Sequence, residues 1–541
     1  MGEKKNGSGV PFYYNHVWKN VLLLALSVVT APISLAAVFP SIAASKLHGH
    51  RTATFSKEDK NHRAAVQQRR TILVTGVSMT KGLTIARNLS QHTPHRIIGA
   101  DISALSPGRF SSALAKYYRL DAPSGDDAEP YIDSILSIMR TEKVDLWISC
   151  SSVVAAVEDG QVVALAEQQA KAQGRHFHAI QFRSDVVEKF HEKDKFIDYI
   201  ESLDLPVPES YRCTSPYEAL DVLMRELHSS SPRALRKQSA KRYQGKKFIM
   251  KPIGVDDRAR ANMMTLLPFS TVDATTTYIR SLNISPSNPF QLQQFIRGKE
   301  YCTHALVVRG KVRTFTCCPS LELLMHYEAL PAYSSLSQEM LRFTQRVCED
   351  GGSEFSGHLS FDFFVEGAET GTGTAEDGDG GKVVRAGGGG GEVKLYPIES
   401  NPRAHTAVVL FEQTPEMADG YLSVFNNTNT TTNSNSKTDI TSRRPSSSTP
   451  PPVFPRAPTY SYYWLGHDLV TFGILPVLDW LFGQISRQDV LNALWTLWTH
   501  VVYWKDGTFT LDDPWPFFAL YHVYWPARFV EAVLRRKAWS R

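Results

Sequence analysis

Two short strings on successive predicted strands constrain the fold of this chain more than any other feature. Residues 398–403 read Ile-Glu-Ser-Asn-Pro-Arg, and residues 359–363 upstream read Leu-Ser-Phe-Asp-Phe. Because residues two apart on an extended strand project from the same face, Glu399 and Asn401 point together. Asp362, on the neighbouring apolar strand, supplies a third oxygen donor. Such a set suits a hard cation, Mg²⁺ or alternatively Mn²⁺, which proteins usually hold with one or two carboxylates and the phosphates of a substrate.

Arg403 follows the second strand directly. From there its planar guanidinium can meet phosphate oxygens, so the string predicts phosphate chemistry together with metal binding. The alternative interpretation is that these charges stand at the solvated end of an edge strand.

Composition places the chain among ordinary globular proteins of two or three domains. It has 541 residues, of which 42% are apolar and 21% charged, and a formal net charge of +5. No basic stripe with interleaved aromatic residues is present, which argues against a nucleic-acid partner. The cysteines lack Cys-x-x-Cys spacing and are interpreted as reduced thiols of a cytosolic compartment rather than as disulfides or zinc ligands; they are Cys150, Cys213, Cys302, Cys317, Cys318 and Cys348.

The N-terminal part predicts membrane attachment. No residue between Lys19 and Lys46 is charged, and residues 21–44 are largely apolar, which is long enough to cross a hydrocarbon layer. Pro32 and Pro40 interrupt the run, so a kinked span and a re-entrant hairpin are both open. A cleaved signal peptide is disfavoured because the apolar run is too long and starts too far from the N-terminus.

Charge around this segment predicts its orientation. Basic residues are more numerous after the segment than before it, which by the positive-inside rule places the large C-terminal part in the cytosol. Those that follow are Lys46, Arg51, Lys57, Lys60, Arg63, Arg69 and Arg70. We therefore expect an N-terminal tail over residues 1–16, a transmembrane or membrane-embedded segment over 17–45 and a polar linker over 46–70.

Alternating strands and helices predict a parallel α/β domain over residues 71–190. Residues 71–76, 96–100 and 144–149 read as buried strands, with helical stretches between them. The turn at residues 76–82 follows a strand and opens a helix, as phosphate-binding loops do. Its glycines do not fit Gly-x-Gly-x-x-Gly, so a structural turn is favoured over a nicotinamide-nucleotide site.

A second unit, over residues 191–425, predicts an α+β fold with a mostly antiparallel sheet. Its strand-like segments are 248–252, 290–296, 300–308, 311–319, 359–365 and 393–399. A Gly-, Thr- and acid-rich run over residues 366–392 reads as a flexible insertion between the two strands of the metal site. Residues 426–458, rich in Asn, Thr, Ser and Pro, read as a disordered linker.

The last segment, residues 459–541, is expected to be helical and rich in aromatic residues. It carries eight of the ten tryptophans, which are Trp464, Trp480, Trp495, Trp498, Trp504, Trp515, Trp525 and Trp539. Tryptophan favours the headgroup layer, so these helices are expected at a membrane interface. The alternative is a helical hairpin that packs on the protein's own core.

The order of charged residues predicts a nucleotide site. Lys195 and Lys251, on different elements, can neutralise phosphate oxygens, and Glu300 can accept hydrogen bonds from two ribose hydroxyls. The backbone of the extended segment between them can pair with the adenine edge while an apolar side chain covers the ring; that segment comprises Gln294, Phe295 and Ile296. Each lysine alone would be an ordinary solvated side chain.

This order resembles the ATP-grasp superfamily over roughly residues 71–420. The resemblance implies ATP as cosubstrate and a pre-ATP-grasp α/β domain that carries part of the acceptor site. It further implies a triphosphate held by Lys195 and Lys251, a ribose held by Glu300, two Mg²⁺ ions on Asp362, Glu399 and Asn401, and a transferred phosphate on Arg403. The chain departs from the family after Lys251, where Val-Asp-Asp-Arg-Ala-Arg stands in place of a glycine-rich loop; Arg258 and Arg260 could clamp the γ-phosphate there.

Finer strings resemble the mycosporine-glycine synthases. They are Thr75-Gly76 with Met79–Lys81, residues 298–304, residues 357–363 and residues 399–406. An apolar N-terminal lead and an aromatic C-terminal segment extend the likeness. It implies an ATP-dependent C–N ligase that attaches the amino acid glycine to the small-molecule acceptor 4-deoxygadusol, with Arg403 and Lys251 in catalytic roles.

Mechanistically, we expect phosphoryl transfer from ATP to an acceptor oxygen, followed by displacement of the phosphate by an amine. His304, His358 and His405 are candidates for acceptor contacts or proton transfer, and a structural role is as probable for each. Three alternatives stay open: a ligase that joins an amino acid to another carboxylate, a membrane-tethered ATP-binding sensor without turnover, and an NAD(P)-dependent enzyme, which the missing glycine fingerprint disfavours.

Overall fold

The protein is described from a computed structural model, over residues 16–66, 69–123, 127–150, 155–229, 246–253, 265–320, 325–366, 394–426 and 450–535. The predicted parallel α/β domain is confirmed. Its five-stranded sheet has the order β3-β2-β1-β4-β5, and all neighbours are parallel. The strands are β1 (Thr71–Thr75), β2 (Arg96–Asp101), β3 (Lys116–Arg119), β4 (Leu146–Ile148) and β5 (His178–Ile180), connected through η2 (Pro107–Phe110), α2 (Thr80–His92), α3 (Glu129–Thr141) and α4 (Ala156–Ala172).

Helices cover both faces of this sheet, which explains why its strands read as continuous apolar runs. On β1, Ile72 and Val74 face a cluster with α2, while Leu73 faces a second cluster with α3 and α4. The strand order reverses between β1 and β4, and the carboxyl ends of strands at such a point flank a crevice. The turn of residues 76–82 leaves β1 at this point.

That turn is tightly packed. Gly76 has φ of 74°, a conformation that side chains with a Cβ rarely adopt. A Cβ on Gly82 would lie 2.5 Å from the Gly76 carbonyl oxygen, so only glycine lets α2 start this close to the strand. The expected structural turn is present, and it places the first residues of α2 at the crevice.

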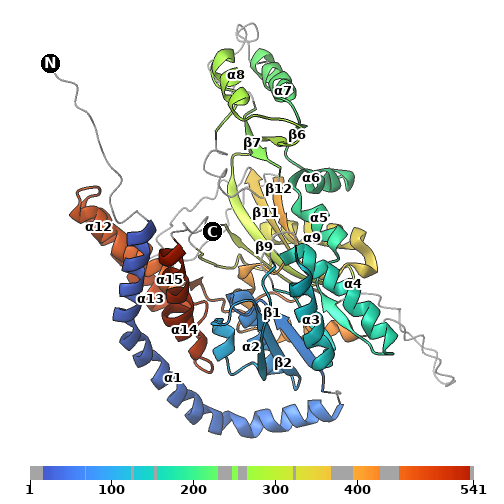
Figure 1. Ribbon diagram of the computed structural model, residues 1–541, viewed down its shortest axis with the longest axis vertical. Helices are drawn as coiled ribbons and strands as arrows, with labels where there is room; N and C mark the ends of the chain where they lie inside the picture. Colours follow the sequence, from blue (N-terminus) through green and yellow to red (C-terminus); the bar gives the residue numbers. More distant parts are fainter. Residues whose placement is uncertain are drawn as a thin grey trace, which may run out of the picture.

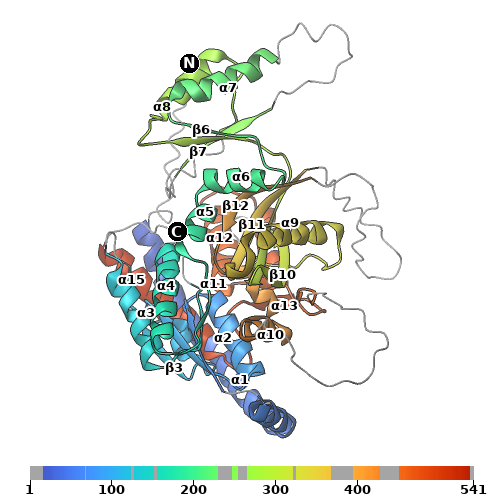
Figure 2. The same cartoon turned by 90° about the vertical axis from the view of Figure 1, so that its right-hand side faces the viewer.

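The second unit contains two antiparallel sheets, as predicted. The smaller sheet has the order β6-β8-β7 and carries α7 and α8, and Figure 2 shows it above the rest of the molecule. The larger sheet has the order β10-β9-β11-β12. The elements are α5 (Ser184–His191), α6 (Lys193–Ser202), β6 (Ser210–Cys213), α7 (Pro216–Ser229), β7 (Phe248–Pro252), α8 (Val272–Ser281), β8 (Phe290–Gln294), β9 (Lys299–Val308), β10 (Lys311–Pro319), α9 (Ser335–Gly351), η7 (Gly352–Glu354), β11 (Gly357–Glu366), β12 (Lys394–Asn401), η8 (Thr406–Phe411), α10 (Glu416–Leu422) and η9 (Ser423–Phe425).

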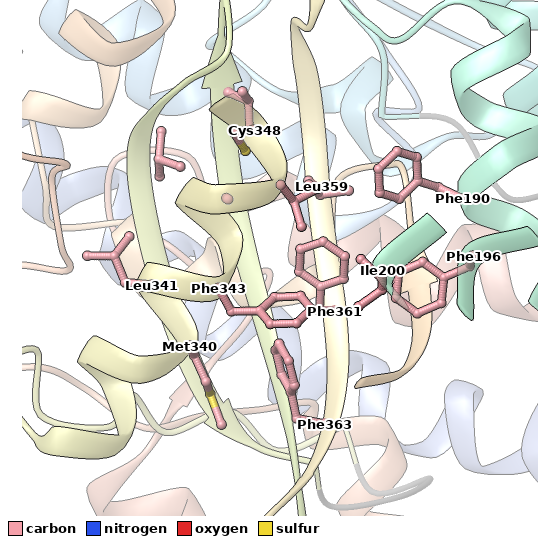
Figure 3. Close-up of a cluster of buried hydrophobic side chains, with 14 of the residues drawn as sticks. Phe190, Phe196, Ile200, Met340, Leu341, Phe343, Cys348, Leu359, Phe361 and Phe363 are labelled. Carbon is pink, nitrogen blue, oxygen red and sulfur yellow. The ribbon is translucent and has the colours of Figure 1, made fainter. Parts of the chain in front are cut away.

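An aromatic core under the larger sheet fixes the orientation of β11. Phe361 and Phe363 are fully buried, and Figure 3 shows both packed with Phe343 of α9. Phe196 of α6 stacks on Phe361 at 5.9 Å from the other side. Since side chains alternate along a strand, this burial turns Asp362 to the opposite face of the sheet.

The N-terminal segment is one helix, α1 (His16–Val66), which continues through Pro32 and Pro40. The re-entrant hairpin is therefore not observed. The helix continues to Val66, so most of the predicted polar linker over residues 46–70 is helical. Within the described residues one helix, over Val17–Leu47, is long and apolar enough to cross a membrane, with a mean hydropathy of 2.4 and 11% buried.

The C-terminal segment packs partly on the protein and partly presents apolar side chains to solvent. Figure 1 shows α1 running beside α14 and α15, and Ser27 donates to the Tyr521 carbonyl at 2.8 Å. Trp495 and Tyr503 are each 66% exposed on α13. The elements are β13 (Tyr462–Tyr463), α11 (Leu465–Asp468), the π-helical η10 (Leu469–Ile474), α12 (Leu475–Leu481), α13 (Arg487–Tyr503), β14 (Lys505–Asp506), α14 (Trp515–Ala519), the π-helical η11 (Leu520–Tyr524) and α15 (Trp525–Arg535).

Two predicted low-complexity regions have different outcomes. The flexible insertion over residues 366–392 lies outside the described residues except for Glu366, which ends β11. Of the predicted disordered linker, residues 427–449 are also outside them. Residues 450–458 are ordered, which corrects that part of the prediction: Val453 exchanges backbone hydrogen bonds with Arg313 and Phe315, and Phe454 packs on the core.

Candidate nucleotide and metal site

The three predicted metal ligands converge on one face at the end of the larger sheet. Asp362 of β11 lies opposite Glu399 of β12, and Ser360 lies opposite Asn401. A β-bulge between Asp362 and Phe363 shifts the register there. The Asn401 amide Nδ2 donates to Asp362 Oδ2 at 3.2 Å. Two carboxylates and an amide are thereby gathered from two paired strands, as the alternation predicted.

Arg403 closes this group. Its Nη2 donates to Asn401 Oδ1 at 2.8 Å, and its backbone N–H donates to the Asn401 carbonyl at the same distance. Burial lowers the pKa of Arg403 below its usual range, while the nearby charges of Glu399 and Asp362 act in the opposite direction. A guanidinium beside two carboxylates is the arrangement expected where phosphate oxygens and a cation meet.

The donor set fits Mg²⁺. All three ligands are oxygen donors, and two of them are half-buried carboxylates that remain accessible to a hydrated cation. Asn401 Oδ1 already accepts from Arg403, yet an amide oxygen has a second lone pair for a cation. Asp362 and Glu399 would thus carry most of the binding.

Lys251 belongs to the same electrostatic group. It stands on β7 and donates from Nζ to Gln293 Oε1 at 2.5 Å. Burial and the neighbouring charge of Lys193 lower its pKa to about 8, while Glu399 and Glu300 oppose that shift. Cations from β7 and α6 therefore face carboxylates from β9 and β12.

Lys195 is not brought to this group. Its Nζ donates to Glu192 Oε1 at 2.9 Å on an exposed part of α6, and its pKa is raised by that hydrogen bond. Lys193, two residues earlier and at the first position of α6, is the lysine whose charge acts on Lys251. Two lysines flank Asp194 in the sequence, and the residue at which α6 begins decides which of them faces Lys251. The assignment of Lys195 to the triphosphate stays a prediction.

The predicted adenine segment is an extended connection between β8 and β9. The backbone N–H of Gln294 donates to the Glu209 carbonyl and that of Phe295 to the Lys247 carbonyl, each at 2.7 Å. Both donors are thus engaged, so the adenine edge would have to pair at or after Ile296, which is buried. A Cβ on Gly298 would lie 2.2 Å from the Val365 carbonyl oxygen, so glycine allows this connection to cross β11 closely.

Glu300, the predicted ribose ligand, begins β9 and lies opposite Phe364 of β11. One carboxylate oxygen accepts from the Ser320 hydroxyl at 2.8 Å. Its charge acts on Lys251, so the two predicted nucleotide contacts share one site. Arg258 and Arg260, the candidates for a γ-phosphate clamp, lie outside the described residues.

A buried basic cluster adjoins Arg403 on the side of the α/β domain. Lys81 of α2 donates to the Ala404 carbonyl at 3.0 Å and is almost fully buried. Burial and the Arg403 charge lower its pKa to about 7. Burial, together with neighbouring cations, lowers the pKa of His358 and of His405 to about 3. Lys81 had no predicted role beyond its place in a short motif, because only the fold brings α2 to residue 404.

The hydrogen bonds of the histidines define which nitrogens carry protons. His358 Nε2 pairs with the Tyr421 hydroxyl at 2.8 Å, and His405 Nδ1 accepts from the Ala407 N–H at 3.3 Å. His304 Nδ1 accepts from the His405 N–H at 3.4 Å, and burial keeps its pKa well below the usual value. A neutral His304 then carries its proton on Nε2, which is buried and has no partner among the described residues.

Comparisons with known proteins find likeness only to solved structures. No protein-family model matches the chain, and no curated protein matches it. N5-carboxyaminoimidazole synthetase from Staphylococcus aureus, complexed with ADP, is similar at 12% identity and a TM-score of 0.42, over 66% of this chain and 76% of that one. The biotin carboxylase–β,γ-ATP complex from Campylobacter jejuni is similar at 14% identity and a TM-score of 0.41, over 65% of this chain and 71% of that one. The L-amino acid ligase from Bacillus licheniformis is similar at 12% identity and a TM-score of 0.37, over 63% of this chain and 69% of that one. Likeness at these values assigns neither a family nor an activity.

Proposed function

We propose that this chain is an ATP-dependent C–N ligase of the ATP-grasp type that joins glycine to 4-deoxygadusol, on a membrane-associated protein whose catalytic part faces the cytosol. One observation carries the nucleotide chemistry. Asp362, Glu399 and Asn401 lie together on paired strands, and Arg403 is hydrogen-bonded to Asn401. An edge-strand end with solvated charges would not hold a half-buried guanidinium by a hydrogen bond to an amide that also donates to Asp362.

ATP would lie between the two antiparallel sheets. Lys251 would neutralise phosphate oxygens from β7, and Glu300 would hold the ribose from β9. Ile296 would meet the adenine edge. Lys251 donates to the buried side chain of Gln293, which would hold the ammonium in place for a phosphate.

Asp362 and Glu399 would hold Mg²⁺, with Asn401 as a third ligand. Bound there, the cation would neutralise charge on the β- and γ-phosphate oxygens. Arg403 would then hold the transferred phosphoryl group from the side opposite the nucleotide. Its guanidinium is fixed by Asn401, so little reorganisation is needed when charge develops.

The reaction would proceed in two steps. An acceptor hydroxyl loses its proton and its oxygen bonds to the γ-phosphorus of ATP, while the bond from that phosphorus to the bridging oxygen breaks and ADP leaves. The glycine nitrogen then bonds to the acceptor carbon and loses a proton. The bond from that carbon to the phosphorylated oxygen breaks, and inorganic phosphate leaves with that oxygen. Positioning and charge neutralisation supply most of the catalysis in such transfers.

The basic cluster beside Arg403 supports an acceptor that bears an anionic or strongly polarised oxygen. Lys81 is buried and reaches the backbone immediately after Arg403. The Nε2–H of His304 is a donor that lacks an acceptor among the described residues. A buried donor without a partner is costly, and a substrate oxygen would satisfy it. The vinylogous acid of 4-deoxygadusol offers such an oxygen.

The test follows phosphate release and product mass, with the full chain in detergent, ATP and Mg²⁺. Phosphate release that requires 4-deoxygadusol and glycine, with a product of the mycosporine-glycine mass, would support the proposal. Release with pairs of amino acids alone would move the activity to a dipeptide-type ligase. ATP binding without release in any mixture would favour a sensor.

Variants tie the activity to the site. Glu399→Gln and Asp362→Asn should abolish phosphate release. Glu366→Gln, on the exposed end of the same strand β11, is the matched control and should retain it. Turnover that persists in both site variants would refute the assignment.

A further inference from the structure

Three buried side chains outside the nucleotide site lie close together and are of the types that bind transition metals, namely two histidines and an aspartate. Asp468 Oδ1 lies 2.8 Å from His326 Nε2, and Asp468 Oδ2 lies 2.5 Å from His500 Nδ1. All the candidate ligand atoms lie within 4.8 Å of one another. Asp468 is completely buried, and His326 and His500 are 6% and 7% exposed.

The three residues come from distant parts of the chain. His326 precedes Tyr327, whose backbone pairs with Tyr462, while Asp468 ends α11 and His500 lies near the end of α13. Asp468 is followed directly by the π-helical η10, and such turns frequently occur at functional sites. The cluster therefore joins the C-terminal segment to the catalytic part.

Aromatic rings enclose the cluster. The His500 ring stacks on Trp504 with centroids 4.2 Å apart, and the His326 ring lies 5.2 Å from the same tryptophan. Phe472 stacks on His326 at 6.1 Å from another side. Asp468 is completely buried within this shell, so its charge has to be compensated by the groups of the cluster. A shell of this kind also fixes the orientation of ligand rings.

We propose that His326, Asp468 and His500 bind one zinc ion through Nε2, a carboxylate oxygen and Nδ1, respectively. Imidazole nitrogen and carboxylate oxygen are both zinc ligands, and three protein ligands with one further position form a common tetrahedral site. At bond lengths of about 2.1 Å, tetrahedral ligand atoms lie about 3.4 Å apart. The two separations between histidine and aspartate are shorter than that value, so the side chains would rotate apart to seat the ion.

Zinc is favoured over a redox metal by the surroundings. Zinc binds imidazole and carboxylate ligands together without any redox chemistry of its own, which suits a site enclosed by Phe472 and Trp504. The role that follows is structural: the ion would hold α11 and α13 against the segment around Tyr327. Tyr327 contacts His405 edge-on at 5.8 Å, so the ion would also fix one wall of the acceptor side. The zinc assignment itself does not depend on the proposed ligase activity.

The test uses the full chain in detergent, to which equimolar ZnCl₂ is added before dialysis. Its metal content is then measured by inductively coupled plasma mass spectrometry. The expected result is one zinc per chain in the wild type, and none in Asp468→Asn or His500→Gln. His176→Gln, at an exposed histidine, is the matched control and should keep its zinc. Glu399→Gln should keep it as well, which separates this site from the proposed Mg²⁺ site.

A second measurement on the wild type does not rely on the folding of variants. Removal of zinc by a chelator should lower the melting temperature, and readdition of zinc alone should restore it. Replacement of zinc by Co²⁺ should give the visible absorption of a tetrahedral nitrogen and oxygen site. A chain that binds no zinc, that keeps zinc when Asp468 and His500 are both replaced, or that takes up iron or manganese in its place would overturn the proposal. If the chain binds no metal at this place, the cluster is a hydrogen-bonded His–Asp–His triad.

Discussion

Replacement of Asp513 by alanine should detach the C-terminal segment from the α/β domain. Asp513 lies between α13 and α14, and its carboxylate accepts from Arg87 Nε of α2 at 2.9 Å. It also accepts from the Ser111 hydroxyl at 2.5 Å and from the Ser112 N–H at 2.8 Å. The side chains of Arg87 and Asp513 are 6% and 4% exposed, so the pair is screened little by water.

The magnitude follows from what remains after the substitution. Arg87 would keep its hydrogen bonds to the backbone carbonyls of Thr508 and Asp513, but its buried charge would lose its counterion. Removal of one partner of a buried pair costs about 3–5 kcal/mol. Converted at about 1.4 kcal/mol per tenfold, this predicts that the segment opens roughly a hundred to several thousand times more often.

Hydrogen exchange measures this opening directly. The reporters are the backbone N–H groups of Tyr462 and Tyr327, which donate to each other's carbonyl groups and so join the C-terminal segment to the rest of the protein without contacting Asp513. Glu354→Ala is the control, because Glu354 lies 3.6 Å from Arg183 with 78% of its side chain exposed. It should change exchange by at most about fivefold. Exchange at both reporters that stays within about tenfold of the wild type in Asp513→Ala would refute the reasoning.

Three further expectations concern the nucleotide site, Lys81 and the membrane. Lys251→Met should weaken MgATP binding by about tenfold or more, measured by calorimetry, while a comparable loss in Lys195→Met would restore Lys195 as a phosphate ligand. The pKa of Lys81 is about 7 in the folded protein, against an ordinary value of 10.5. Between these two pH values Lys81 is therefore protonated in the unfolded chain and largely neutral in the folded protein. The stability of the wild type relative to Lys81→Met, measured by denaturant unfolding, should therefore rise with pH from about 7 to 10, and a flat difference would contradict this. On α1, the triple change of Val28, Val29 and Ile33 to lysine should release the protein from liposomes in flotation, because these side chains are 70–73% exposed and pack on little else.

Strand alternation let the sequence predict how the three residues of the proposed metal site are arranged. Apolar residues on both sides of Asp362 require burial, and that burial turns the carboxylate to the other face. The same rule predicted that Glu399 and Asn401 point together, and the register of β11 and β12 brings all three into one place. These are local properties of two strands, and the strands pair whatever the length of the segment between them.

Features that depend on distant packing were not predictable in this way. Lys193 and Lys195 differ only in the face of α6 that they occupy, and the starting point of that helix decides which one faces Lys251. His326 and Asp468 are separated by 142 residues, and no spacing rule connects them. The ordered stretch around Val453 was hidden in a proline- and serine-rich run, because its order comes from pairing with β10 rather than from its own composition.

The stretch of residues 401–406 is where these separate units constrain one another. Asn401 belongs to the larger sheet, the Ala404 carbonyl accepts from Lys81 of the α/β domain, and the His405 ring contacts Tyr327. The C-terminal segment reaches the same place, since Trp464 contacts Tyr327 edge-on at 5.8 Å and donates to Thr80 at the start of α2. Arg403 is therefore held at a joint of three units, each of which can displace it only by breaking buried contacts. A guanidinium fixed in that way is preorganised for a phosphate, which is the property that the proposed transfer most requires.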